Sequence, residues 1–138
     1  METKERKQTL SENATIVQSV YDAFGRGDVE AVFGLVHPGI EIYQSSRLPW
    51  GGSYSGYEGF GEFLAKLTGA VESRVETERY IDDEEDHVVA VGRTRGRVLA
   101  TGTRFDVPET HVWTIRNGKV MRFESYIDTK LMREALGL

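Results

Sequence analysis

The sequence predicts an α+β fold in which helices from the first half of the chain pack on a strongly curved, mainly antiparallel sheet. Apolar residues recur at helical spacing through residue 71, and apolar and polar residues alternate as in strands from residue 74 onward. A strong two-residue hairpin signal, Asn117-Gly118, joins the last two strand segments. Because the strands are long and the helices few, we expect the sheet to curl around the first helix.

Three helices are expected before the long strands. The first runs from Ala14 to Phe24, where apolar residues share one helical face, and Gly25 and Gly27 end it. Asp28 is the expected N-cap of the second helix. The predicted buried face of that helix comprises Val29, Val32, Phe33 and Val36, before Pro38 and Gly39 stop it. The third helix begins at Glu58.

The remaining segments are predicted to be strands joined by turns. The expected strands are Ile40–Gln44, Arg74–Ile81, His87–Leu99, Phe105–Arg116 and Lys119–Asp128. Residues 45–57 are rich in Ser, Gly and aromatic side chains, which favours a covering loop. The five acids of residues 82–86 indicate a solvated turn, and residues 129–136 a short terminal helix.

Length and composition limit the classes of function. The 138 residues fit one domain, with residues 1–12 as a flexible tail and residues 13–138 as the folded unit. The absence of cysteine excludes disulfides, thiolate metal sites and thiol catalysis, and it is compatible with the cytoplasm, where we expect the protein. No run of 18 apolar residues and no secretory signal is found, so no membrane is expected as a partner.

The charge pattern argues against nucleic acid as a partner. The formal net charge is −5, and the only dense basic cluster is Arg93, Arg95 and Arg97. These arginines alternate onto one strand face. That face either lines a pocket for an anionic ligand or, as is more common, lies in solvent on the outside of the sheet.

Three stretches of the chain carry a resemblance to a known superfamily. They read VYDAFGRGDVEAV, GYEGFGEF and HVWTIRNGKVMRFESYIDT. They resemble the SnoaL-like and ketosteroid-isomerase-like branch of the NTF2-like superfamily, over residues 14–136. The resemblance implies a cone-shaped fold with a pocket between the helices and the concave sheet face, and a homodimer formed through the outer sheet face. The superfamily includes isomerases, cyclases, dehydratases and non-catalytic binding domains, so the fold alone selects no activity.

The resemblance also implies that the known catalytic positions have changed. Ketosteroid isomerase uses an aspartate base, with a tyrosine and a protonated aspartic acid as oxyanion donors. The base falls on Gln44, whose amide cannot take up a proton, and the protonated acid falls on His111. The tyrosine falls on Val20, with Tyr21 about 100° further around the helix. The catalytic aspartate of SnoaL-type cyclases falls on Ser125, so isomerase chemistry by the known route is not expected.

His111 and Glu109 are the candidate catalytic residues. An imidazole titrates near working pH, and strand parity places His111 on one face with Glu109 and Trp113. A carboxylate beside an imidazole fixes its tautomer, which makes the two residues a candidate dyad on the pocket wall. The alternative is a hydrogen-bonded histidine in an apolar cavity, with Glu109 at an exposed bend after Pro108.

The expected ligand-binding wall combines aromatic and polar side chains. It comprises Tyr21, Gln44, Trp50, Tyr57, Phe63, Trp113, Phe123 and Ser125. The loop aromatics Trp50, Tyr54 and Tyr57 either roof a hydrophobic ligand or pack against the third helix.

The predicted function is the binding of a small, mainly apolar organic molecule, with proton transfer by His111 of the isomerase, cyclase or dehydratase type. The alternative is a non-catalytic small-molecule-binding or protein-interaction domain of the same fold. No metal is expected, because the three histidines lack the spacing of a metal site, and no cofactor is expected.

Overall fold

The computed structural model describes residues 10–138 as four helices on one six-stranded sheet. Residues 1–9 of the predicted tail lie outside the described residues. The helices are α1 (Glu12–Gly25), α2 (Val29–Gly34), α3 (Gly56–Ala70) and α4 (Thr129–Ala135). The strands are β1 (Val36–Gln44), β2 (Gly52–Ser55), β3 (Val71–Asp82), β4 (His87–Val98), β5 (Arg104–Arg116) and β6 (Lys119–Ile127).

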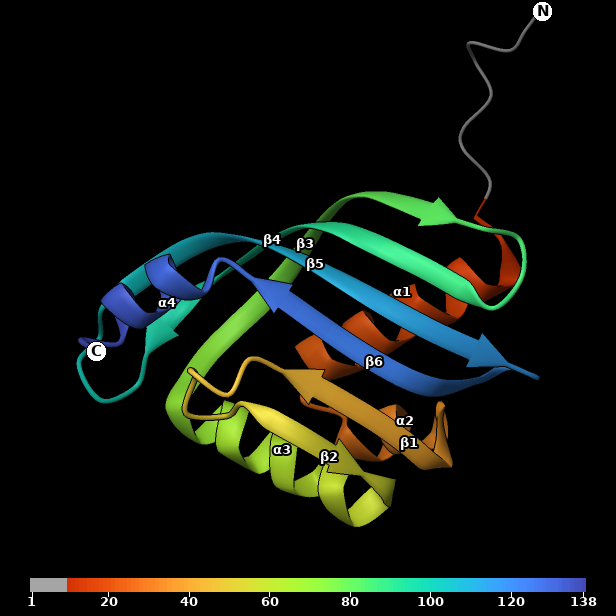
Figure 1. Cartoon of the computed structure of the whole chain (residues 1–138), viewed down its shortest axis with the longest axis horizontal. Coiled ribbons are helices and arrows are strands. Elements are labelled where there is room, and N and C mark those ends of the chain that lie inside the picture. The colour runs from red at the N-terminus through yellow and green to blue at the C-terminus, as the bar shows by residue number, and fades with distance from the viewer. Residues whose placement is uncertain (1–9) are drawn as a thin grey trace, which may run out of the picture.

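The sheet has the order β2-β1-β6-β5-β4-β3 and is strongly curved (Figure 1). β1 and β6 run parallel, and every other neighbouring pair is antiparallel. The predicted α+β class and the mainly antiparallel sheet are therefore confirmed. Figure 1 shows α1 beneath the curved sheet and α3 along its β2 side.

Helix α1 is amphipathic, as its sequence predicts, and Ser11 caps its start. The Ser11 hydroxyl accepts a hydrogen bond from the backbone N–H of Ala14 at 3.0 Å, which satisfies one of the free donors at the helix start. The helix buries one face against the sheet. The buried residues on that face are Ala14, Val17, Val20 and Ala23. Asp28 caps α2 in the predicted way, by accepting from Ala31 at 3.0 Å.

The second helix is shorter than predicted, and the strand after it is longer. Helix α2 ends at Gly34, Val29 is 52% exposed, and Val36 is buried in β1 rather than in the helix. The cause lies in β6, where the backbone N–H of Val120 donates to Leu35 at 2.9 Å and so draws the chain into the sheet. Pro38 lies in the irregular stretch where β1 loses its register with β6.

The segment 45–57 is only partly a loop, contrary to prediction. Its residues Gly52–Ser55 form β2, which pairs antiparallel with the end of β1. A four-residue edge strand of Gly, Ser and Tyr has almost no apolar alternation, so the sequence pattern does not reveal it.

Two glycines of β4 permit the close approach of β3. An added Cβ at Gly92 would lie 2.1 Å from the carbonyl oxygen of Glu76, and one at Gly96 would lie 2.0 Å from that of Glu72. The register between β3 and β4 shifts beside Gly92. Only glycine fits at these two points, and β3 lies close over β4 where the sheet curves.

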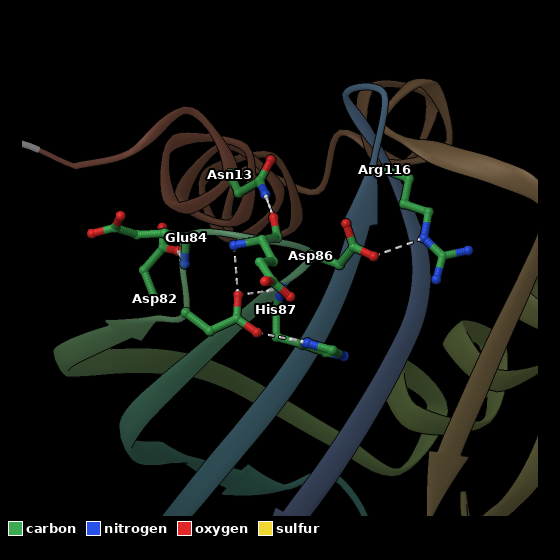
Figure 2. A network of polar contacts seen from close by, with 8 residues as sticks. Asn13, Asp82, Glu84, Asp86, His87 and Arg116 are labelled. Atoms are coloured by element: carbon green, nitrogen blue, oxygen red, sulfur yellow. Dashed lines mark hydrogen bonds and ion pairs between the residues drawn. The ribbon is translucent and has the colours of Figure 1, made fainter.

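The acidic turn of residues 82–86 fastens the start of α1 to the sheet (Figure 2). The Ser11 hydroxyl donates to the Asp82 carboxylate, and the Asn13 amide donates to the carbonyl of Glu85 at 3.0 Å. On the other side of the turn, Asp86 pairs with Arg116 of β5 at 2.9 Å. The predicted turn is exposed, and it also orients α1 over the concave face.

Candidate functional site

A cavity of about 100 Å³ lies between the helices and the concave face of the sheet. Its walls are mostly apolar and aromatic. Its polar lining residues are Tyr21, Gln44, Ser73, Thr94, Glu109, His111 and Ser125. None of the described lining residues is Lys or Arg.

Strand β5 projects three functional side chains into this cavity. Glu109, His111 and Trp113 alternate with outward-facing residues and are 8%, 5% and 5% exposed. The expectation that they share a face is confirmed. The alternative of an exposed Glu109 is wrong, because β5 continues through Pro108 without a bend toward solvent.

Four side chains form a buried hydrogen-bonded chain. The Nε2 atom of His111 lies 2.8 Å from Oε2 of Glu109, and its Nδ1 atom lies 2.6 Å from the hydroxyl of Tyr21 on α1. The indole N–H of Trp113 donates to the same hydroxyl at 3.2 Å. Helix α1 and strand β5 are thereby joined through the side of the cavity.

The protonation of Tyr21 decides the direction of this chain. Burial raises the pKa of Tyr21 well above its usual value, so the hydroxyl keeps its proton. Because a carboxylate only accepts, the Nε2–H of His111 donates to Glu109, and Nδ1 of the neutral imidazole then accepts from the Tyr21 hydroxyl, which itself accepts from Trp113.

Both nitrogens of His111 are therefore engaged within the protein. The sequence predicts that His111 acts on the ligand directly, and that role stays a prediction. The group with a free atom is Glu109, whose Oε1 is buried and has no hydrogen-bond partner among the described residues. In the described structure, Glu109 is thus the member of the dyad that can contact a ligand.

A second buried polar group faces the same cavity from β1. Gln44 is 3% exposed, and its Nε2 has no hydrogen-bond partner among residues 10–138. Gln44 pairs in register with Ser125 of β6, which in turn pairs with His111 of β5. The three residues form one row across neighbouring strands, all on the concave face.

The aromatic wall packs tightly around His111. The ring centroid of Phe123 lies 4.8 Å from that of His111 and 4.5 Å from that of Trp113, and Phe63 of α3 lies 6.2 Å from Phe123. Trp50, 3% exposed, also lines the cavity. The structure thus brings together most of the predicted wall. The members that line the cavity are Tyr21, Gln44, Trp50, Phe63, Trp113, Phe123 and Ser125.

Tyr57, predicted as a member of that wall, lies outside the cavity lining. It is 43% exposed, its hydroxyl donates to the carbonyl of Val36 at 3.1 Å, and its ring packs on Phe33. Its position at the first turn of α3 directs it away from the cavity. Tyr54 supports the roof indirectly, because its hydroxyl donates to the carbonyl of Trp50 at 3.1 Å.

The arginine cluster lies outside the cavity, in the more common of its two predicted arrangements. Arg93 and Arg95 pair with Asp106 at 2.6 and 3.1 Å, and Arg97 pairs with Glu72 at 2.9 Å. Among the described residues, the cavity wall therefore carries no Lys or Arg. The same alternation turns Thr94, which the sequence analysis omitted, into the cavity. Because Arg93 and Arg95 on either side of it point outward, the alternation of a strand places the Thr94 side chain on the inner face.

The lining of the cavity also includes Met132 of α4, which the sequence analysis did not identify. The terminal helix has too few turns for its buried face to be read from apolar spacing. Among residues 10–138, no group of three or more His, Asp or Glu side chains is placed to hold a metal ion. No described helix is long and apolar enough to cross a membrane.

The cavity, the curved sheet and the matching family model define the class of protein. The model of the SnoaL-like domain matches residues 17–123, and the chain belongs to this family, within the NTF2-like fold. Among curated proteins, no sequence matches the chain.

Solved structures give the same fold over nearly the whole chain. An NTF2-like protein from Burkholderia pseudomallei is 24% identical, with a TM-score of 0.85 over 94% of this chain and 100% of that one. TerC, co-crystallised with polyporic acid, is 28% identical, with a TM-score of 0.84 over 93% and 100%. An NTF2-like protein from Burkholderia xenovorans is 27% identical, with a TM-score of 0.82 over 94% and 99%.

Proposed function

We propose that the protein binds a small, mainly apolar organic molecule in the cavity and transfers a proton to or from it. The observation that carries the proposal is the Glu109 carboxylate, which is buried with one oxygen on His111 and the other without a partner. A carboxylate held in this way is an oriented general base, and its protonated form is a general acid.

The other members of the chain position this base. The Nε2–H of His111 holds Oε2, which leaves Oε1 for a C–H or O–H group of the ligand, and Tyr21 fixes the imidazole from the opposite side. A proton that Glu109 removes from one ligand atom returns from Glu109 to another, so that atoms and charge balance over the cycle. Proton transfer of this kind needs no metal and no cofactor.

TerC supports the binding half of the proposal. It is 28% identical over nearly the full chain and was co-crystallised with polyporic acid. We propose that this chain likewise takes an organic molecule into the cavity, between the aromatic wall and the helices. A mostly apolar pocket with a few converging polar groups is the usual form of a small-molecule site.

The test is a reaction that reports a buried carboxylate base. In 5-nitrobenzisoxazole, removal of the C3 proton breaks the N–O bond and releases a coloured cyanophenolate. We expect the protein to accelerate this elimination, and Glu109→Gln to lower the rate by about 10²-fold or more. Glu62→Gln, an exposed carboxylate on α3, is the control and keeps the parent rate. A rate that is the same in the parent and in Glu109→Gln overturns the catalytic proposal.

Binding without turnover is the second candidate. The observation that favours it is the engagement of both His111 nitrogens within the protein. In this case 5-nitrobenzisoxazole binds the parent and Glu109→Gln alike by calorimetry, and neither protein accelerates the elimination.

We propose a homodimer formed through the outer face of the sheet. Ile81, Val89 and Val112 lie in register across three strands on this face, and Ile81 is 46% exposed. Tyr126 adds a second exposed apolar surface on β6. Light scattering is expected to give twice the monomer mass, and Val112→Glu to give the monomer; a monomeric parent at micromolar concentration contradicts the proposal.

A cytoplasmic location is proposed from the cysteine-free sequence.

A further inference from the structure

Two buried polar atoms on the cavity wall have no partner among the described residues. They are Nε2 of Gln44 and Oε1 of Glu109, on side chains 3% and 8% exposed as residues. Leaving a buried polar atom without a hydrogen bond is energetically costly, and native proteins contain few such atoms. The two atoms have opposite character, because the amide nitrogen only donates and the carboxylate oxygen only accepts.

The sheet register separates these two atoms across the cavity. Gln44 lies two strands away from His111 in one row, which is about 10 Å between Cα atoms, and Glu109 lies two residues further along β5. No hydrogen bond joins the two side chains. A molecule held between them is therefore contacted at two separate points, by a donor at one and an acceptor at the other.

The size and charge of the cavity restrict that molecule further. The volume is about 100 Å³, below the 150 Å³ of a closed engineered cavity that holds one benzene in another protein, but this cavity is partly open to solvent; together these limit the ligand to one ring with small substituents. Trp113 and Phe123 offer flat apolar faces beside the polar row. With neither Lys nor Arg among the described lining residues, an anion has no charged partner apart from a protonated His111.

We infer that Gln44 and Glu109 form a two-point clamp for an uncharged molecule of about one substituted ring, with a hydroxyl on Glu109 and a carbonyl oxygen on Gln44. The inference rests on the proposed function and narrows it to one ligand class. The clamp also places the carbonyl oxygen, where negative charge develops when a neighbouring proton is removed, on an N–H donor.

The test is calorimetry with three matched probes. 4-Hydroxyacetophenone carries both groups, acetophenone lacks the hydroxyl, and 4-ethylphenol lacks the carbonyl. We expect the parent to bind 4-hydroxyacetophenone about tenfold or more tightly than either of the others. Gln44→Met removes the advantage over 4-ethylphenol and keeps that over acetophenone. Glu109→Met gives the reverse pattern, and circular dichroism checks that each variant is folded.

The opposite probe preferences expected for the two variants distinguish a two-point clamp from a general loss of binding. Equal losses for all three probes in Gln44→Met overturn the inference, and this arm stands even where Glu109→Met fails to fold. Binding of 4-hydroxybenzoate as tightly as 4-hydroxyacetophenone overturns the uncharged class. Binding of the much larger polyporic acid without any single-ring probe overturns the clamp while the proposed function stands. That function is judged separately, by the Glu109-dependent elimination.

Discussion

Residues 10–138 contain two carboxylate–imidazole pairs of nearly equal length in very different surroundings. Glu109 and His111 lie 2.8 Å apart with side chains 7% exposed, whereas Asp83 and His87 lie 2.9 Å apart with side chains 44% and 51% exposed. Asp83 also accepts backbone hydrogen bonds from Glu85 and His87, so its oxygens serve the turn. The buried pair keeps one oxygen without a partner. This carboxylate oxygen without a partner, and not the carboxylate–imidazole pair itself, makes the buried pair a candidate ligand-binding site.

The largest expected difference between the pairs is in stability. His111→Ala leaves Glu109 and Tyr21 without their shared partner and opens a void, which we expect to lower the free energy of unfolding by about 3–5 kcal/mol. His87→Ala removes an exposed partner and leaves the urea midpoint unchanged within error. Urea denaturation measures both, and equal midpoints for the two variants would show that the buried chain contributes nothing to the fold.

Removing one hydroxyl from the buried chain is expected to have a smaller effect on the free energy of unfolding. Tyr21→Phe keeps the ring but leaves Nδ1 of His111 and the N–H of Trp113 without a partner, at an expected loss of about 1–3 kcal/mol. Tyr126→Phe is the matched control, because that hydroxyl is on the outer face and donates to Glu124. The prediction fails if the two Phe variants have the same urea midpoint.

The smallest expected effects are at the two ends of the pH range. Burial raises the pKa of Tyr21, so above about pH 10 the unfolded chain loses this proton first and stability falls as pH rises. Hydrogen bonds from the Glu85 backbone and from His87 lower the pKa of Asp83, so stability falls as pH drops below about 4. Tyr21→Phe should flatten only the alkaline limb and Asp83→Asn only the acid limb, as measured by urea midpoints against pH. Flattening of the opposite limb would contradict the assignment.

Much of the site could be predicted because strand parity is strict. Glu109, His111 and Trp113 alternate on β5, so their common inward face follows from a period of two once one of them is placed. The same rule places the arginines of β4 outside. Strand parity does not determine which atoms remain without hydrogen-bond partners, since that depends on the distances between strands and on the position of α1.

The contact between Tyr21 and His111 could not be predicted from the sequence, for a geometric reason. By position in the family pattern the tyrosine falls on Val20, and Tyr21 lies about 100° further around the helix. The long Tyr21 side chain nevertheless reaches His111, 90 residues later in the chain. Strand β2 could not be predicted either, because a four-residue segment of Gly, Ser and Tyr carries almost no apolar alternation. The early end of α2 depends on pairing with β6, far away in the sequence.

The position of the two tryptophans has a spectroscopic consequence. Trp50 and Trp113 are the chain's only tryptophans, both are buried, and both line the cavity. All intrinsic indole emission of the protein therefore originates at the cavity wall, in an apolar environment. Because the Trp113 ring lies 6.1 Å from that of His111, and an imidazolium quenches indole emission, the protein carries its own optical reporter of the charge on that histidine.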